Sequence, residues 1–175
     1  IMILVFGKTG QVATGLQRSG DVLALGRDQA NFSDPDACAQ WIHSLGPSAV
    51  INAAAYTAVD KAEENEELAT IINGDTPTAI AQACAKTQIP LIHISSDYVF
   101  EGSGEAPWKP SDTTAPLNAY GRSKLVGEEG ILCSGAIHAI LRTSWVVSAH
   151  GENFVKTMLR LSETYDTLNV VADQI

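Results

Sequence analysis

The sequence predicts an α/β fold: a doubly wound, parallel, Rossmann-type sheet with helices on both faces. Short runs of β-forming apolar residues alternate with longer helical patterns, an order typical of parallel strands joined by right-handed crossovers. The expected strands are apolar without interruption, as in a sheet covered on both sides. The first strand runs directly into a glycine turn that opens a helix, which is typical of the start of a βαβ unit.

The same alternation locates six strands and five helices. The strands are expected at residues 2–6, 22–25, 49–52, 91–95, 139–142 and 168–171, and the helices at 11–19, 36–45, 66–87, 120–132 and 153–163. Asp34 and Pro35 suit the N-cap and first position of the second helix, which Gly46 ends. Pro77 falls inside the third helical pattern, so we expect that helix to bend or restart there.

Length and charge limit the function classes. A chain of 175 residues suits one domain with at most the start of a second. The net charge is −9 and no block of Lys or Arg is present, so no nucleic-acid partner is expected. The acidic balance indicates solubility, and it does not forbid a nucleotide ligand, because a glycine loop before a helix can hold phosphate.

The cysteines and the N-terminus indicate a cytoplasmic protein. Cys38, Cys84 and Cys133 are odd in number and far apart, so neither a disulfide framework nor a metal site is expected. The opening run IMILVFG is too short to cross a bilayer and lacks a basic region and a cleavage site. It predicts a strand rather than a signal peptide or a membrane anchor.

The glycine turn that follows the first strand reads Gly7-Lys8-Thr9-Gly10-Gln11-Val12-Ala13. This G-x-x-G-x-x-A pattern, after a strand and before a helix, indicates dinucleotide binding. Gly7 permits the sharp turn, Gly10 lets the backbone approach a pyrophosphate, and Ala13 allows close helix packing. A plain βα turn with convenient glycines is the alternative.

The end of the second strand bears on the choice of cofactor. Arg27 there favours the 2′-phosphate of NADPH, whereas the adjacent Asp28 keeps NADH as an alternative. A solvated turn of mixed charge would also explain these two residues.

A tyrosine, a lysine and a serine form a candidate catalytic set. Tyr120 and Lys124 share one helix face, and an ammonium near a phenol lowers the phenol pKa. Such a tyrosine can pass a proton to a carbonyl oxygen. Ser96 ends the fourth strand, where α/β sheets bind ligands, and its hydroxyl can orient the same oxygen. We expect Ser95 only to bond the backbone, and residues 101–117 to form an active-site loop.

These residues belong to longer segments that resemble a known family. The segments are FGKTGQV (6–12), NAAAYTAVDKAE (52–63), SSDYVF (95–100), APLNAYGRSKLVGE (115–128), RTSWVV (142–147) and NFVKTMLRL (153–161). The chain is similar to the extended branch of the short-chain dehydrogenase/reductase superfamily and, within it, to the dTDP-4-dehydrorhamnose reductases. The segments span nearly the whole chain in order.

The resemblance implies a role for each matching residue. Ser96, Tyr120 and Lys124 would form the catalytic triad, with Tyr120 as proton donor and Lys124 on the nicotinamide ribose. The cofactor would contact Gly7, Gly10, Gln11, Val12, Arg27, Asn31, Phe32, Ser33, Ala53, Ala54, Ala55, Tyr56, Tyr120 and Lys124. The sugar nucleotide would contact Asp97, Tyr98, Trp145 and Asn153. Core packing is the alternative for Tyr98 and Trp145, and an N-cap role is the alternative for Asn153.

The chain also departs from the family pattern. Asn31 stands where many relatives carry Asp, which puts the ribose and adenine contacts in doubt. Some relatives use a Glu shortly after the turn in a metal-bridged dimer; this chain has Gly15, so no metal is expected. The family continues into a small substrate-covering domain, so residues 1–175 are expected to be an NAD(P)-binding domain truncated before it.

The expected function is reduction of the 4-keto group of dTDP-4-dehydro-6-deoxy-L-mannose to dTDP-L-rhamnose, with NADPH or alternatively NADH. The resemblance also allows a homodimer. One alternative is a nucleotide-sugar epimerase or dehydratase of the same superfamily, although dehydratases need an acidic pair and only Asp97 is present. The other is a non-catalytic regulatory subunit resembling that of methionine adenosyltransferase.

Overall fold

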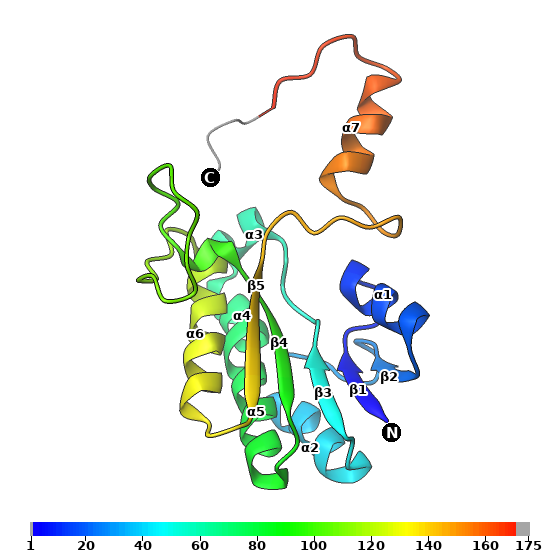
Figure 1. The fold of residues 1–175 in the computed structure, drawn as a ribbon, viewed down its shortest axis with the longest axis vertical. Coiled ribbons are helices and arrows are strands. Elements are labelled where there is room, and N and C mark those ends of the chain that lie inside the picture. The colour runs from blue at the N-terminus through cyan, green and yellow to red at the C-terminus, as the bar shows by residue number, and fades with distance from the viewer. Residues whose placement is uncertain (1, 171–175) are drawn as a thin grey trace.

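The computed structural model describes residues 2–170, and its centre is a parallel sheet of five strands. The strands are β1 (Ile3–Phe6), β2 (Val22–Leu25), β3 (Ala49–Asn52), β4 (Leu91–Ser96) and β5 (His138–Thr143). They are arranged in the order β2-β1-β3-β4-β5 (Figure 1). The chain steps from β1 to β2 on one side and to β3 on the other, so the sheet is doubly wound and the predicted fold class is confirmed.

The sixth strand predicted at residues 168–171 is wrong for the part that can be checked. Residues 168–170 are not extended strand, and residue 171 lies outside the described residues. A short apolar run becomes a strand only where its N–H and C=O groups meet a neighbour. In the described part of the chain, β5 pairs with β4 alone.

The helices follow the predicted order, with α3 and a 3₁₀ turn in addition and the pattern at 66–87 divided. They are α1 (Gln11–Ser19), α2 (Pro35–Leu45), α3 (Val59–Glu64), α4 (Glu66–Thr70), α5 (Thr76–Thr87), α6 (Ala119–Cys133) and α7 (Phe154–Ser162), with a 3₁₀ turn η2 (Asp97–Val99) after β4. Asp34 caps α2 by accepting a hydrogen bond from the Ala37 N–H at 3.0 Å, and Gly46 ends it in the left-handed region. Both predictions for that helix are confirmed.

The helical pattern predicted at 66–87 is divided by a π-helical turn, η1 (Ile71–Asp75), which joins α4 to α5. Pro77 follows at the start of α5 and has no N–H to donate to the preceding turn. The expected irregularity near Pro77 takes the form of η1, in which the Thr76 N–H donates to the Ile71 carbonyl. The six-residue helix α3 was not predicted.

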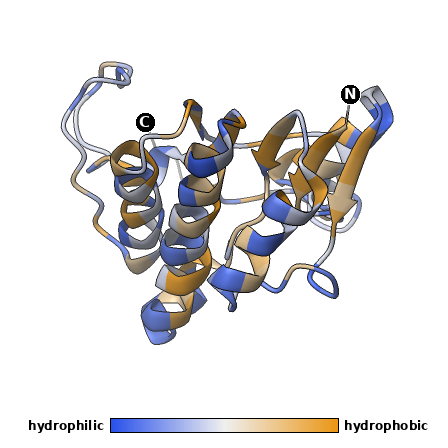
Figure 2. Ribbon diagram, turned by 90° about the horizontal axis from the view of Figure 1, so that it is seen from below, coloured by the Kyte–Doolittle hydropathy of each residue, from blue (hydrophilic) through white to orange (hydrophobic). Residues whose placement is uncertain are grey.

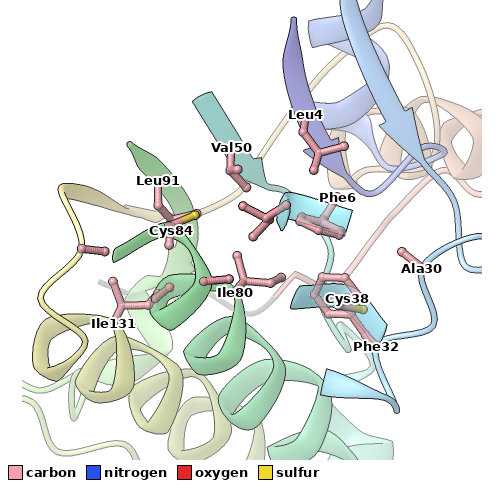
Figure 3. Packing of buried hydrophobic residues seen from close by; sticks show 14 of the residues in the cluster. Leu4, Phe6, Ala30, Phe32, Cys38, Val50, Ile80, Cys84, Leu91 and Ile131 are labelled. Atoms are coloured by element: carbon pink, nitrogen blue, oxygen red, sulfur yellow. The ribbon is translucent and has the colours of Figure 1, made fainter. Parts of the chain in front are cut away.

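Helices cover both faces of the sheet, but unequally. On one face α2, α5 and α6 bury a large cluster that includes Leu4, Phe6, Ile42, Ile80 and Ile131 (Figure 3). On the other face α1 covers a small cluster centred on Val5, Ala13 and Ile51. Figure 2 shows hydrophobic strands and helices that are hydrophobic on one side only. Alternate residues of one strand therefore serve two different cores.

The carboxyl ends of the strands carry the long connections. Residues 101–118 follow η2, and residues 144–153 lead from β5 to α7, which buries none of its residues and lies apart from the sheet (Figure 1). No helix in the described part of the chain combines the length and apolar character needed to cross a bilayer.

Candidate active site

A cavity of about 750 Å³ opens at the carboxyl ends of β1, β3, β4 and β5. Ligands of open α/β sheets bind at this edge. The predicted site residues that line it are Gly10, Gln11, Val12, Ala53, Ala54, Ala55, Ser96, Asp97, Tyr98, Tyr120, Lys124 and Trp145. Segments far apart in the sequence therefore converge on one space.

The β1–α1 turn forms one wall of the cavity. Gly7 has φ +104°, and a Cβ added there would lie 3.1 Å from the carbonyl group of Ala53 at the end of β3. Gly10 is the N-cap of α1 and has no side chain to cap it, so the first N–H groups of the helix remain free beside the cavity. Ala13 is fully buried in the small core cluster. The turn therefore suits a phosphate group.

Gln11 ties this turn to the segment that follows β5. Its side chain donates a hydrogen bond to the Val146 carbonyl at 3.2 Å and accepts bonds from Ser148 Oγ and Asn153 Nδ2, each at 3.0 Å. Asn153 also caps α7 by accepting a bond from the Lys156 N–H. The N-cap alternative for Asn153 is thus realised, and Asn153 is not among the cavity-lining residues.

Ser96 and Tyr120 meet on the opposite side of the cavity. Ser96, buried at the end of β4, donates a hydrogen bond to Asp97 Oδ1 at 3.0 Å. Tyr120 lies in the first turn of α6, which Asn118 caps. Burial raises the pKa of Tyr120; the hydrogen bond with Ser96 opposes this shift, while Asp97 and Tyr98 add to it. The phenol therefore keeps its proton at neutral pH.

Lys124 lies one helical turn after Tyr120 and is only 1% exposed. Its Nζ donates a hydrogen bond to the Ile94 carbonyl at 2.8 Å and lies 3.4 Å from His93 Nε2. Burial lowers the pKa of Lys124 to about 8. The predicted lowering of the Tyr120 pKa is not found, because the pKa shift that burial causes outweighs the other contributions.

Side chains from η1 and α3 hold the start of α6 in place. Asn73 bonds the backbone of Tyr56 in both directions and donates to Ser123 Oγ at 3.0 Å. Glu63 accepts a hydrogen bond from the Ala119 N–H at 2.7 Å. Tyr120 and Lys124 are thereby fixed relative to the sheet.

A second set of contacts anchors the predicted active-site loop. Trp108 stacks on Phe100 with ring centroids 4.8 Å apart, and the Arg142 guanidinium lies 4.8 Å from the Phe100 ring. Arg142 also forms an ion pair with Glu128 at 2.6 Å, and the Glu128 side chain is 1% exposed. A groove along β5 is lined by the same residues.

Two buried polar atoms have no hydrogen-bond partner in the described part of the chain, Ser95 Oγ and Trp108 Nε1. The expectation that the Ser95 hydroxyl bonds the backbone is therefore wrong. Both residues line the cavity. Buried polar groups are normally paired, so these two are suited to a ligand, and they were not proposed as ligand contacts from the sequence.

Several predicted cofactor residues lie outside the cavity lining. Phe32 is buried in the large core, with its ring 5.7 Å from that of Phe6. Asn31 accepts a hydrogen bond from the Ser33 N–H at 3.1 Å, and Arg27 is exposed in the β2–α2 turn. Tyr56 packs against the large core. Gly7 also lies outside the lining and packs against the Ala53 carbonyl at the end of β3.

The aromatic residues predicted to face the sugar are not core residues. Trp145 is 60% exposed, has φ +48° and packs edge-on against Phe154 at 4.9 Å. Tyr98 packs edge-on against Tyr120 at 5.5 Å and is 36% exposed. Among the described residues, no group of three or more His, Cys, Asp and Glu side chains could hold a metal ion.

Comparison with known proteins agrees with this geometry. The family model described as the RmlD substrate binding domain matches residues 1–175. The dTDP-4-dehydrorhamnose reductase of Salmonella typhimurium is 47% identical over 98% of this chain and 60% of its own length. That of Sinorhizobium fredii is 45% identical over 99% of this chain and 60% of its own length.

Solved structures give the same result. The crystal structure of a dTDP-4-dehydrorhamnose reductase from Clostridium acetobutylicum superposes with a TM-score of 0.92 at 36% identity, covering 98% of this chain and 62% of that one. A Bacillus anthracis enzyme of the same name, in complex with NADP, gives 0.89 at 32% identity, covering 94% and 60%. The chain thus spans about 60% of the length of the curated relatives it matches.

Proposed function

Because the chain belongs to the RmlD substrate binding domain family, we propose that it reduces the 4-keto group of dTDP-4-dehydro-6-deoxy-L-mannose to dTDP-L-rhamnose, with NADPH as the reductant and NADH as an alternative. The observation that carries the proposal is the convergence of Ser96, Tyr120 and Lys124 on a cavity that the free N-terminus of α1 also lines. Residues 1–175 act as the NAD(P)-binding domain in this proposal.

The residues present fit a dinucleotide. Free N–H groups at α1 suit the pyrophosphate, and a Cβ added at Gly10 would meet nothing within 4 Å, so the turn is open beside them. Ser95 Oγ, buried and unpaired among the described residues, offers a further donor at the cavity floor. When bound, NADPH supplies the hydride.

The protein supplies the proton and the orientation. Tyr120 is protonated at neutral pH, since burial raises its pKa above the ordinary value, and it can give that proton to a ketone oxygen. Ser96 offers a hydroxyl to the same oxygen and orients it. Trp108 stacks on Phe100 and the Arg142 guanidinium lies over the same ring, which holds the 101–118 loop beside the cavity.

Replacement of Tyr120 by Phe in the full-length protein tests this proposal. We expect NADPH-dependent reduction of the keto sugar to fall by about 10²–10⁴-fold, the usual contribution of a general acid. Tyr165→Phe, at an exposed position outside the cavity lining, is the matched control and keeps its activity. Activity of Tyr120→Phe near that of the control would overturn the mechanism.

Two other outcomes would redirect the assignment. Tightly held NAD that copurifies and is regenerated in each turnover favours an epimerase, and a stoichiometric synthetase partner without reductase activity favours a regulatory subunit. A cytoplasmic location is supported by three separated thiols and can be checked by cell fractionation. The homodimer stays a prediction, which analytical ultracentrifugation checks.

A further inference from the structure

Three polar residues are buried beneath the cavity, each from a different element. Asn52 ends β3, His93 lies in the middle of β4, and Lys124 lies in α6; none is more than 1% exposed. Asn52 Nδ2 is 3.1 Å from His93 Nδ1, and His93 Nε2 is 3.4 Å from Lys124 Nζ. The proposed mechanism uses Lys124 and assigns nothing to the other two.

The direction of the first hydrogen bond is set by the backbone. The Ala54 N–H donates to Asn52 Oδ1 at 3.1 Å, so the oxygen of that amide faces Ala54 and its NH₂ group faces His93. An NH₂ group only donates. His93 Nδ1 must therefore accept, which requires that it carries no proton.

The second contact follows from the first. Burial and the neighbouring Lys124 lower the pKa of His93 well below its ordinary value, so the ring is neutral and has one proton. Because Nδ1 has none, the proton is on Nε2, the atom that faces Lys124. An ammonium has three donors and no acceptor, whereas a neutral amine has a lone pair. Only the amine can accept a hydrogen bond from this N–H.

We propose that His93 is a positioning residue: its Nε2–H offers a bond that only neutral Lys124 accepts, so the amine is held to β4 by both His93 and the Ile94 carbonyl, whereas the ammonium keeps the Ile94 bond alone. In the amine state Tyr120 keeps its proton. In the ammonium state Lys124 loses the His93 bond, keeps the bond to the Ile94 carbonyl and can stabilise the phenolate. The role at Tyr120 rests on the proposed function; the tautomer and the contact do not.

The charges around Lys124 are consistent with a change of state near neutral pH. On α6 it has Glu128, which raises its pKa, and Tyr120 one turn before; burial still brings the pKa to about 8. From β5, Arg142 pairs with Glu128 at 2.6 Å and offsets its charge. β4 contributes His93 and the Ile94 carbonyl, and β3 contributes the uncharged Asn52.

Nitrogen-15 NMR of histidine in the full-length, cofactor-free protein tests the proposal between pH 6 and 10. His93, assigned with His93→Gln, is expected to have a protonated Nε2 and a bare Nδ1 throughout. Its Nε2 shift should move with a midpoint near the Lys124 pKa of about 8. In Lys124→Met that transition should vanish. A proton on Nδ1, an invariant shift, or the same transition in Lys124→Met would overturn the proposal.

Two variants separate positioning from a merely structural role. His93→Gln keeps an N–H donor, so its pH–rate profile should follow the wild type, whereas His93→Leu should lose the limb that reports Lys124. If His93→Leu does not fold, Asn52→Asp takes its place. A carboxylate accepts from Nδ1–H, leaves Nε2 as an acceptor and should move the Lys124 midpoint upward by at least about one pH unit. An unmoved midpoint contradicts the proposal. The NMR result needs no turnover, so failure of the reductase assignment remains distinguishable.

Discussion

The two walls of the cavity differ in the chemical groups that form them. The nucleotide wall, formed by the β1–α1 turn and the end of β3, exposes backbone N–H groups and small residues such as Gly10 and Ala53. The catalytic wall, formed by β4 and α6, buries ionisable groups, among them His93, Lys124 and Glu128. Substitutions in the first wall should act through the space available to the backbone, and substitutions in the second should act through protonation and charge pairing.

The largest effect is expected behind the catalytic wall. Arg142→Met leaves Glu128 buried without its partner, which costs about 3–5 kcal/mol of unfolding free energy. The matched control is Arg122→Met, because Arg122 pairs with Glu66 at a site where both side chains are more than 40% exposed. That change should cost about 0–1 kcal/mol. Urea titrations of both variants measure the loss of unfolding free energy, and equal losses would refute the expected contrast between the buried and the exposed ion pair.

Removal of the buried lysine should stabilise the protein while abolishing its proposed activity. The Lys124 pKa is about 8 in the folded protein and 10.5 ordinarily, so the unfolded chain binds a proton more tightly. Stability therefore rises with pH between these two values, and at pH 7 the buried lysine lowers the free energy of unfolding by about 3 kcal/mol. Lys124→Met should gain about 2 kcal/mol there, since the lost bond to Ile94 costs about 1.

The pH dependence checks the cause of that gain. Thermal unfolding from pH 6 to 10.5 should show the difference between Lys124→Met and wild type shrinking as the pH rises through the Lys124 pKa of about 8. A gain that is independent of pH would point to packing instead of charge burial.

The nucleotide wall should respond to single methyl groups in two different ways. At Gly7 an added Cβ meets the Ala53 carbonyl and φ is positive, so Gly7→Ala should cost about 1–3 kcal/mol of stability and weaken NADPH binding. At Gly10 the Cβ meets nothing within 4 Å, so Gly10→Ala should fold normally and lose only cofactor affinity. Melting curves and fluorescence titration with NADPH separate the two, and a stable Gly7→Ala would contradict the packing argument.

The features that the sequence predicts correctly are those that depend on a local pattern of residues. The glycine turn, the strand ends and the helix face shared by Tyr120 and Lys124 follow from short motifs, and the structure brings them to one cavity. The bonds of Gln11 to residues 135 to 142 positions away have no local signal. The pKa of Tyr120 was expected to fall and instead rises, because burial is set by the packing of α6 and not by the spacing of two residues.

The approach of α6 to η1 has a consequence for how freely this fold can vary. A Cβ at Gly127 would collide with the backbone carbonyl of Asn73, so the two segments touch through main-chain atoms. Lys124 precedes that contact by less than one turn of α6. This main-chain contact therefore fixes the distance between α6 and η1 close to Lys124, and a larger residue at Gly127 would have to move the helix that carries the amine.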